Sequence, residues 1–175
     1  MDKNAMRFFL SEHNIDLHVQ HLEELRLRLS IFSKSGYEII GKSYHELCRI
    51  RLGDARGEIL SLASDIFYHE LYFSSFGMGG TKAASRGSRY SSAAGFLYEL
   101  EREAMRHTEG FLLVYQDSVG AVIGHSASMV HRRLGEPKLA IDLAEHAYFI
   151  DYGFDKLSYV RAALTRLELS KIDKI

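Results

Sequence analysis

Two side chains that can bind a cation lie close together in the C-terminal third of the chain. Asp142 and His146 stand four residues apart within the stretch LAIDLAEHAYFIDY. Residues four apart share one face of a helix, and we expect a helix to begin at Asp142. A carboxylate and an imidazole on one face can each give a lone pair to the same metal ion. Taken alone, an Asp and a His at this spacing more often form a hydrogen bond along a helix than a metal site. The neighbouring residues must therefore decide between the two interpretations.

The surrounding string resembles a family signature. The run DLAEHAYF, which begins at Asp142, is similar to D-x-W-E-H-A-Y-Y, the C-terminal signature of the iron and manganese superoxide dismutases. The resemblance implies that Asp142 and His146 are metal ligands and that Glu145 contacts a ligand histidine of a partner subunit. Two positions depart from the signature, because Ala144 replaces its tryptophan and Phe149 replaces its second tyrosine.

Two further histidines complete the ligand set that the resemblance implies. The run SEHNIDLH, which ends at His18, has the spacing of the family's S-x-E-T-I-E-Y-H, and HELYF, which begins at His69, resembles its H-x-F-Y-W. Taken alone, His18 lies on the apolar stripe of a helix, where a core histidine bonded to a carbonyl is the commoner interpretation. Together with Asp142 and His146, these residues form a set of three imidazoles and one carboxylate. Such a set suits iron, manganese or zinc and disfavours calcium and magnesium.

The groups that surround the metal in the family are largely replaced. Family enzymes carry a histidine four residues and a tyrosine eight residues after the first ligand, where this chain has Leu22 and Arg26. Asp65 stands four residues before His69, where the iron enzymes carry a glutamine that binds the metal-bound water. We predict catalytic roles for Arg26, which can attract an anion, and for Asp65, which should stabilise the oxidised, more positive metal. The alternative for both is a solvated side chain on a helix face.

Three tryptophans that surround the metal in the family are also missing. Their positions hold Phe111, Leu113 and Ala144, and the chain contains no tryptophan. Smaller side chains leave room for a ligand larger than superoxide if repacking does not fill the space. A contact across the family's dimer is lost at both ends, at Leu22 and Phe149, which leaves no buried polar group unpaired. We therefore expect the homodimer to persist without the proton path through it.

Hydrophobic spacing predicts an α+β fold. Helical periodicity over Ser11–Phe32 and Arg56–Phe76 indicates an N-terminal antiparallel helical hairpin, and the Gly/Ser-rich stretch 77–92 follows as a linker. We expect a helical hairpin domain over residues 1–80 and an α/β domain over residues 81–175, with a three-stranded antiparallel sheet flanked by helices. The other expected elements are a short helix over 44–51, a helix over 93–107, strands over 111–115, 121–130 and 139–141, and a last helix over 159–172.

Composition narrows the class of protein. The chain has 175 residues, of which 46% are hydrophobic, so it can bury a full core. Its net charge of −1 and the lack of a dominant basic run argue against a nucleic-acid partner. No apolar run approaches the length of a membrane span, so we expect no membrane association. A single cysteine, Cys48, and an N-terminus without signal-peptide features predict a cytoplasmic protein.

Three functions fit these observations. The first is a superoxide dismutase with an iron or manganese ion and altered surroundings of the metal, acting on superoxide as a homodimer. The second is a metal-dependent oxidoreductase or oxygenase that acts on a small organic substrate in an enlarged pocket. The third is a non-catalytic interaction protein that keeps a metal, zinc included, for stability. The four ligands favour the first function, while the missing proton-relay side chains argue against a fast dismutase.

Overall fold

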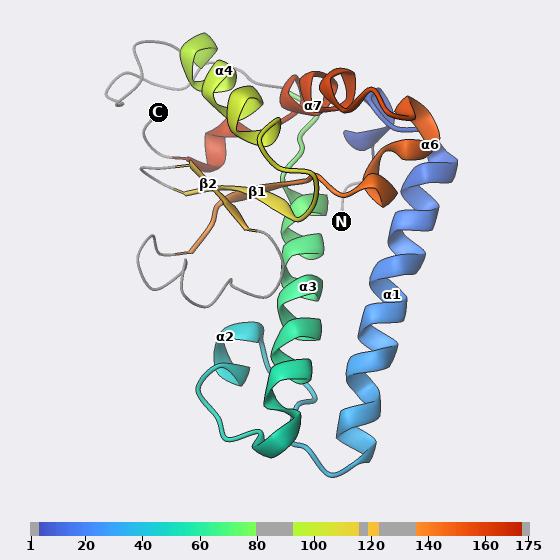
Figure 1. Cartoon of the computed structure of the whole chain (residues 1–175), viewed down its shortest axis with the longest axis vertical. Helices are drawn as coiled ribbons and strands as arrows, with labels where there is room; N and C mark the ends of the chain where they lie inside the picture. The colour runs from blue at the N-terminus through green and yellow to red at the C-terminus, as the bar shows by residue number, and fades with distance from the viewer. Residues whose placement is uncertain (1–3, 80–92, 116–118, 123–135, 173–175) are drawn as a thin grey trace.

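The computed structural model describes residues 4–79, 93–115, 119–122 and 136–172 (Figure 1). Helices predominate in the described residues, and the strands form one antiparallel sheet, so the chain has the predicted α+β class. The predicted boundary between residues 80 and 81, and most of the predicted linker, lie outside the described residues.

Two long helices run side by side in opposite directions (Figure 1). Helix α1 spans Glu12–Lys34 and helix α3 spans Arg56–Ser74, close to the predicted bounds. Ser11 caps α1, because its side chain accepts a hydrogen bond from the backbone N–H of Asn14 at 3.2 Å. Helix α3 also packs against strand β3 (Leu139–Asp142) and the short helix α2 (Tyr44–Leu47).

Short helical turns precede and connect these helices. A 3-10 turn, η1, covers Met6–Phe8, and another, η2, covers Gly53–Ala55 just before α3. Helix α2 covers only Tyr44–Leu47, so the predicted helix over 44–51 is too long. A capping box between Ser43 and the third residue of α2 starts it, but the chain leaves the helix within one turn, before Gly53 takes a φ of +54°.

The sheet has the strand order β2-β1-β3, with both pairs antiparallel. Strand β1 covers Phe111–Val114, β2 covers Val119–Val122 and β3 covers Leu139–Asp142. The start of β2 lies two residues before the predicted start at residue 121, and the remainder of the predicted strand, residues 123–130, lies outside the described residues. Strands β1 and β3 are buried along their whole length.

Two further helices pack against each other beside the sheet (Figure 1). Helix α4 covers Ala93–Ala104, three residues shorter than predicted, and α7 covers Lys156–Leu164. The prediction of a last helix over 159–172 is wrong, because the chain leaves the helix after Leu164 and pairs with the end of α3. There Leu167 forms an antiparallel bridge with Phe76, and a 3-10 turn, η4, follows over Leu169–Lys171.

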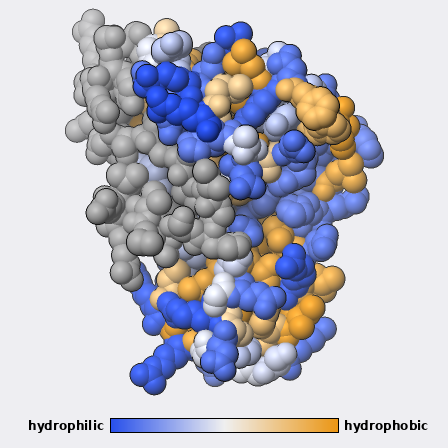
Figure 2. Space-filling model, viewed as in Figure 1, coloured by the Kyte–Doolittle hydropathy of each residue, from blue (hydrophilic) through white to orange (hydrophobic). Residues whose placement is uncertain are grey.

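A continuous hydrophobic core joins the helical and sheet parts of the described chain. A hydrogen bond reinforces this junction, since the backbone N–H of Ala140 in β3 donates to Oγ of Ser75 at the end of α3 at 2.7 Å. Figure 2 shows hydrophobic residues reaching the surface beside hydrophilic ones. The most exposed of them near α6 are Phe149 at 44%, Ile150 at 49% and Phe154 at 88%. Among the described helices, none combines the length and the apolar character needed to span a bilayer.

Candidate metal centre

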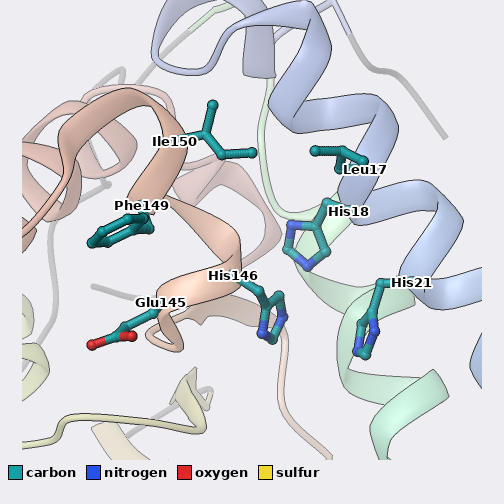
Figure 3. Close-up of a pocket in the computed structure, with 7 residues that line it drawn as sticks. All are labelled: Leu17, His18, His21, Glu145, His146, Phe149 and Ile150. Atoms are coloured by element: carbon teal, nitrogen blue, oxygen red, sulfur yellow. The ribbon is translucent and has the colours of Figure 1, made fainter.

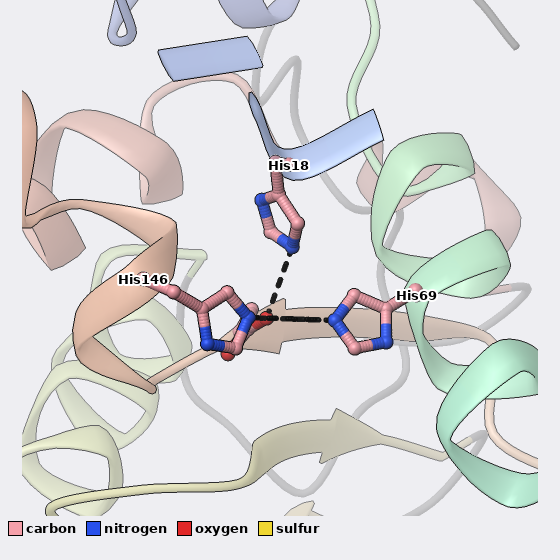
Figure 4. A group of neighbouring side chains, drawn as sticks. His18, His69 and His146 are labelled. Carbon is pink, nitrogen blue, oxygen red and sulfur yellow. Dashed lines mark hydrogen bonds and ion pairs between the residues drawn. The ribbon is translucent and has the colours of Figure 1, made fainter. Parts of the chain in front are cut away.

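Four predicted ligand residues converge where the long helices meet the sheet. His18 comes from α1, His69 from α3, Asp142 from the end of β3, and His146 from a 3-10 turn, η3, over Glu145–Ala147. One ligand atom from each residue lies within 4.8 Å of the others. Figure 4 shows the three histidine rings pointing toward one another from these separate elements. The chain therefore brings together residues that are up to 128 positions apart (146 − 18).

The local conformation around Asp142 differs from the prediction. Asp142 and His146 do not share a helix face, because Asp142 is the last residue of β3 and pairs with Phe111 of β1. Ala144 is extended, with φ −73° and ψ 150°, and the chain turns only at η3 before the short helix α6, which covers Phe149–Tyr152. The turn still brings Nε2 of His146 within 3.1 Å of Oδ2 of Asp142.

The spacing of the donor atoms suits a bound transition metal. Oδ2 of Asp142 lies 3.2 Å from Nε2 of His18 and 3.5 Å from Nε2 of His69. The Nε2 atoms of His69 and His146 are 3.4 Å apart. A cation about 2.1 Å from each of two donors at a tetrahedral angle would hold those donors about 3.4 Å apart. These separations, together with the 3.1 Å between His146 and Asp142, match the spacing that two donors on one ion require.

A backbone contact fixes the tautomer of His69. Its Nδ1 lies 2.7 Å from the carbonyl oxygen of Asp65, one helical turn earlier, and a carbonyl can only accept. Nδ1 therefore carries the proton, and Nε2 of the neutral ring presents a lone pair toward the carboxylate of Asp142. Two acceptors that face each other are unfavourable unless a cation lies between them. This arrangement fits a metal ligand better than a structural histidine.

The surroundings of His18 lead to the same interpretation. Its side chain is fully buried, with rings of Tyr72 and Phe73 at centroid distances of 5.0 and 5.2 Å. Within the described residues, neither ring nitrogen of His18 has a hydrogen-bond partner, since Nε2 is close to Asp142 but poorly oriented toward it. Buried polar groups without partners are rare and costly. Coordination of a metal would satisfy Nε2.

Hydrogen bonds hold both the carboxylate and the backbone of Asp142 in place. Its Oδ1 accepts from the backbone N–H of Ala144 at 2.9 Å, and its backbone carbonyl accepts from the hydroxyl of Tyr159 on α7 at 2.9 Å. Burial alone would raise the pKa of Asp142, but the imidazoles of His146 and His18 outweigh burial and hold that pKa well below its usual range. Asp142 is therefore an oriented anion at the centre of the group.

His69 and His146, whose rings face each other, differ in their exposure to solvent. The side chain of His69 is 4% exposed, and burial, partly opposed by the charge of Asp142, lowers its pKa to about 4. The side chain of His146 is 43% exposed. Burial lowers its pKa, but the hydrogen bond to Asp142 outweighs burial, so the pKa of His146 is raised overall. His69 thus faces the core, while His146 faces solvent.

A pocket of about 340 Å³ opens on the solvent side of the group (Figure 3). Most of its lining surface is apolar, although three imidazoles and one carboxylate belong to its wall. The residues that line it are Leu17, His18, His21, Glu145, His146, Phe149 and Ile150. The pocket therefore connects the surface to His18 and His146, two of the four candidate ligands.

His21 is a residue of this site that the sequence reasoning missed. It lies three residues after His18 on α1, and its ring is 4.8 Å from that of His146 and 5.1 Å from that of His69, centroid to centroid. Burial, followed by the neighbouring His146 and His18, lowers the pKa of His21. Residues three apart share a helix face, so the spacing from His18 could have indicated its position.

The two predicted catalytic residues are placed differently. Arg26 does not line the pocket; it forms ion pairs with Glu23 of α1 at 2.5 Å and with Glu70 of α3 at 2.6 Å. The charge of Asp65 is close enough to raise the pKa of His146. Its backbone carbonyl is hydrogen-bonded to His69. The structure therefore brings Asp65, but not Arg26, into contact with the ligand group.

The positions of the missing tryptophans are partly filled. Phe111 packs its ring against His69 and Tyr68 at centroid distances of 5.0 and 5.4 Å, and Leu113 is fully buried. The pocket in Figure 3 is lined by neither of these residues nor by Ala144. This pocket thus lies between α1 and the η3–α6 segment, and not beside the positions where the family carries tryptophan.

Comparison with known proteins places the chain in a family. Residues 82–175 match the family model described as iron/manganese superoxide dismutases, C-terminal domain, and this match includes Asp142 and His146. The chain belongs to the iron/manganese superoxide dismutase family. Its curated relatives include the iron superoxide dismutase of Cupriavidus metallidurans, 30% identical over 125 residues, which are 66% of this chain and 64% of that protein. The iron superoxide dismutase of Babesia bovis is 29% identical over 117 residues, or 61% of this chain and 59% of that protein. The matches thus span less than two thirds of either relative.

Proposed function

We propose that the protein holds one iron or manganese ion between His18, His69, Asp142 and His146 and dismutes superoxide to oxygen and hydrogen peroxide. The observation that carries this proposal is the convergence of three imidazole nitrogens and one carboxylate oxygen within 4.8 Å. The bound ion would supply one-electron oxidation and reduction. Three nitrogens and one oxygen suit iron, manganese or zinc, and membership of this family favours the two redox-active metals.

The residues of the chain would hold and orient the reacting groups. The carbonyl of Asp65 keeps the Nε2 lone pair of His69 directed inward, and the backbone N–H of Ala144 holds Oδ1 of Asp142. These contacts fix both ligands before a metal arrives, which lowers the ordering cost of binding. We propose that the carboxylate of Asp65 additionally favours the oxidised metal through its charge.

Arg26 would act only at a distance. Its guanidinium is paired with Glu23 and Glu70, so two carboxylates offset the positive charge that would attract superoxide. Exposed pairs of this kind are screened by solvent and salt. We therefore propose a modest steering role for Arg26 rather than a contact with the substrate.

We propose a homodimer that contacts the pocket side of the site. Glu145 is exposed at the rim of the pocket and points away from His146 of its own chain (Figure 3). Phe149 and Ile150 are nearly half exposed beside it. In the family, the glutamate at the position of Glu145 reaches a ligand histidine of the partner. Sedimentation of the protein and of Glu145→Ala tests this: the variant should dissociate at a higher concentration.

A second function has one observation in its favour. The pocket of about 340 Å³ falls in the size range of sites for small organic ligands, and its apolar lining would favour such a molecule. Under this alternative the same metal would serve an oxidoreductase or oxygenase reaction. Phe149 and Ile150, which supply much of the apolar wall, would then contact the substrate.

The test begins with metal analysis of the purified protein. Superoxide consumption is then measured for the protein loaded separately with iron, manganese and zinc, beside a demetallated control. Activity with iron or manganese, and none with zinc, supports the dismutase. Full metal content with no activity above the control would overturn the proposed dismutase and leave the organic-substrate alternative or a purely stabilising metal.

A further inference from the structure

The pocket carries one polar side chain, besides the ligands themselves, that is directed at the metal group. Four of its lining residues have polar side chains, namely His18, His21, Glu145 and His146, and two of these are proposed ligands. We propose that His21 donates a hydrogen bond to a small anion bound at the metal from the pocket side, and so sets the affinity for that anion. This proposal rests on the proposed metal site and identifies the group that recognises its non-protein ligand.

The position of His21 supports this role. Its ring lies 4.8 Å from the ring of His146 and 5.1 Å from that of His69, centroid to centroid. The ligand rings themselves are separated by similar distances, 5.2 Å for His18 and His69 and 5.1 Å for His18 and His146. The ring of His21 thus belongs to the same compact cluster of imidazoles. Figure 3 shows it beside His146 on the open side of the group.

His21 lies at the edge of the cluster and outside the ligand set. The four donor atoms that lie within 4.8 Å of one another come from the other residues and do not include a nitrogen of His21. An imidazole that does not coordinate the metal retains an N–H that can donate to a metal-bound anion. His21 can therefore contact a ligand on the metal without contacting the metal.

Among the residues that the structure describes, the remaining lining of the pocket offers an anion no further hydrogen-bond donor. Glu145 is negatively charged and points away from the histidines (Figure 3), while Leu17, Phe149 and Ile150 are apolar. An anion that enters such a pocket loses water and regains hydrogen bonds only from the donors it finds there. A single donor at His21 should consequently have a measurable effect on affinity.

Azide is a suitable probe because it is a small anion that binds ferric iron with a change in absorption. The full chain is loaded with iron(III), and azide is titrated into the unsubstituted protein and into His21→Ala. We expect the dissociation constant for azide to rise about tenfold in the variant, as for the loss of one hydrogen bond to a charged group. His21→Gln, which keeps an N–H donor, should recover part of that loss.

A matched control comes from the preceding residue. Gln20 is exposed and lies outside the pocket, so Gln20→Ala should leave both iron content and azide affinity unchanged. Full iron content in His21→Ala with unchanged or tighter azide binding overturns this proposal alone. Loss of iron from His21→Ala overturns it too, because His21 would then be a ligand. Failure of the unsubstituted protein to hold iron overturns the proposed function and this proposal together.

Discussion

The two sides of the metal group differ in how firmly the chain holds them. On the side formed by α3 and β3, His69 and Asp142 are almost completely buried, and backbone groups bind both of them. On the side formed by η3 and α1, His146 is 43% exposed and a pocket reaches the ring of His21. We call these the closed side and the open side. The closed side fixes the geometry of His69 and Asp142, while the open side connects the group to solvent through the pocket.

The largest effect should come from removing the anion at the centre of the closed side. Asp142→Ala leaves three imidazoles without their common partner and the N–H of Ala144 without its acceptor. Loss of one partner from a buried charged group costs about 3–5 kcal/mol of unfolding free energy. Metal content should also fall nearly to zero. Urea unfolding and metal analysis measure the two effects, with Asp155→Ala, at an exposed cap, as the control.

If Asp142→Ala keeps its metal and its stability, the distinction between the two sides is wrong, because the closed side would not depend on the charge of Asp142.

Removing the metal should have the next largest effect, because the ligands come from separate elements. An ion present at a thousand times its dissociation constant stabilises the folded state by about 4 kcal/mol. Chelation should therefore lower the melting temperature, and restoring iron or manganese should raise it again. Calorimetry of the two forms measures this difference. Equal melting temperatures, with metal bound in one form only, would show that the ion does not join the two sides.

Single ligand substitutions should sharpen the contrast when they are compared in the demetallated protein. His69→Ala removes a buried ring that packs against Phe111, and the resulting cavity should cost about 2–3 kcal/mol. His146→Ala removes a ring that is 43% exposed, and its cost should stay within about 1 kcal/mol. Urea unfolding of both variants measures the difference. Equal costs would contradict the distinction between a closed and an open side.

The smallest expected loss of stability comes from a hydrogen-bonded contact between α6 and the start of α1, on the open side. Asp151 of α6 accepts from the backbone N–H of Ser11 at 2.8 Å and from Nδ2 of Asn14 at 3.0 Å, so it ties α6 to the start of α1. Asp151→Asn keeps the size of the side chain but weakens these hydrogen bonds, and we expect a loss of about 1 kcal/mol. Metal content should be unchanged, because the closed side is untouched.

The same variant has a defined pH dependence. Burial raises the pKa of Asp151, but the hydrogen bonds from Ser11 and Asn14 outweigh burial and lower that pKa overall. A lowered pKa means that the contribution of Asp151 is fully present above about pH 4 and is lost as the pH falls through the folded-state pKa. The stability curves of the two proteins should therefore converge in acid. A constant difference down to low pH would show that the carboxylate charge does not stabilise this contact.

The four side chains that converge could be named from the sequence, but their local geometry could not be predicted. The motifs around His18, His69 and Asp142 match the family's spacing closely enough to identify the residues that the fold brings together. The helix expected at Asp142 was wrong, because a short apolar run suits a strand and a helix equally well. Pairing of β3 with β1 decides between them, and that pairing depends on residues 31 positions away (142 − 111).

Other differences have the same origin. The last helix was placed too late because periodicity beyond Leu164 does not reveal the bridge between Leu167 and Phe76, which draws the chain out of the helix. The sequence did not predict His21, because the family pattern has its polar side chains four and eight residues after the first ligand, not three. The position of His21 in the site depends on the packing of η3 and α3 against α1, and local sequence spacing does not reveal that packing.

The contact between His69 and the carbonyl of Asp65 has a consequence for how the sequence can diverge. The acceptor is a main-chain oxygen, which every residue at position 65 provides as long as α3 remains helical. Substitution there can alter the charge beside the site without disturbing the ring that it orients. A lineage could therefore exchange glutamine for aspartate at this position, and retune its chemistry, while inheriting the same imidazole orientation.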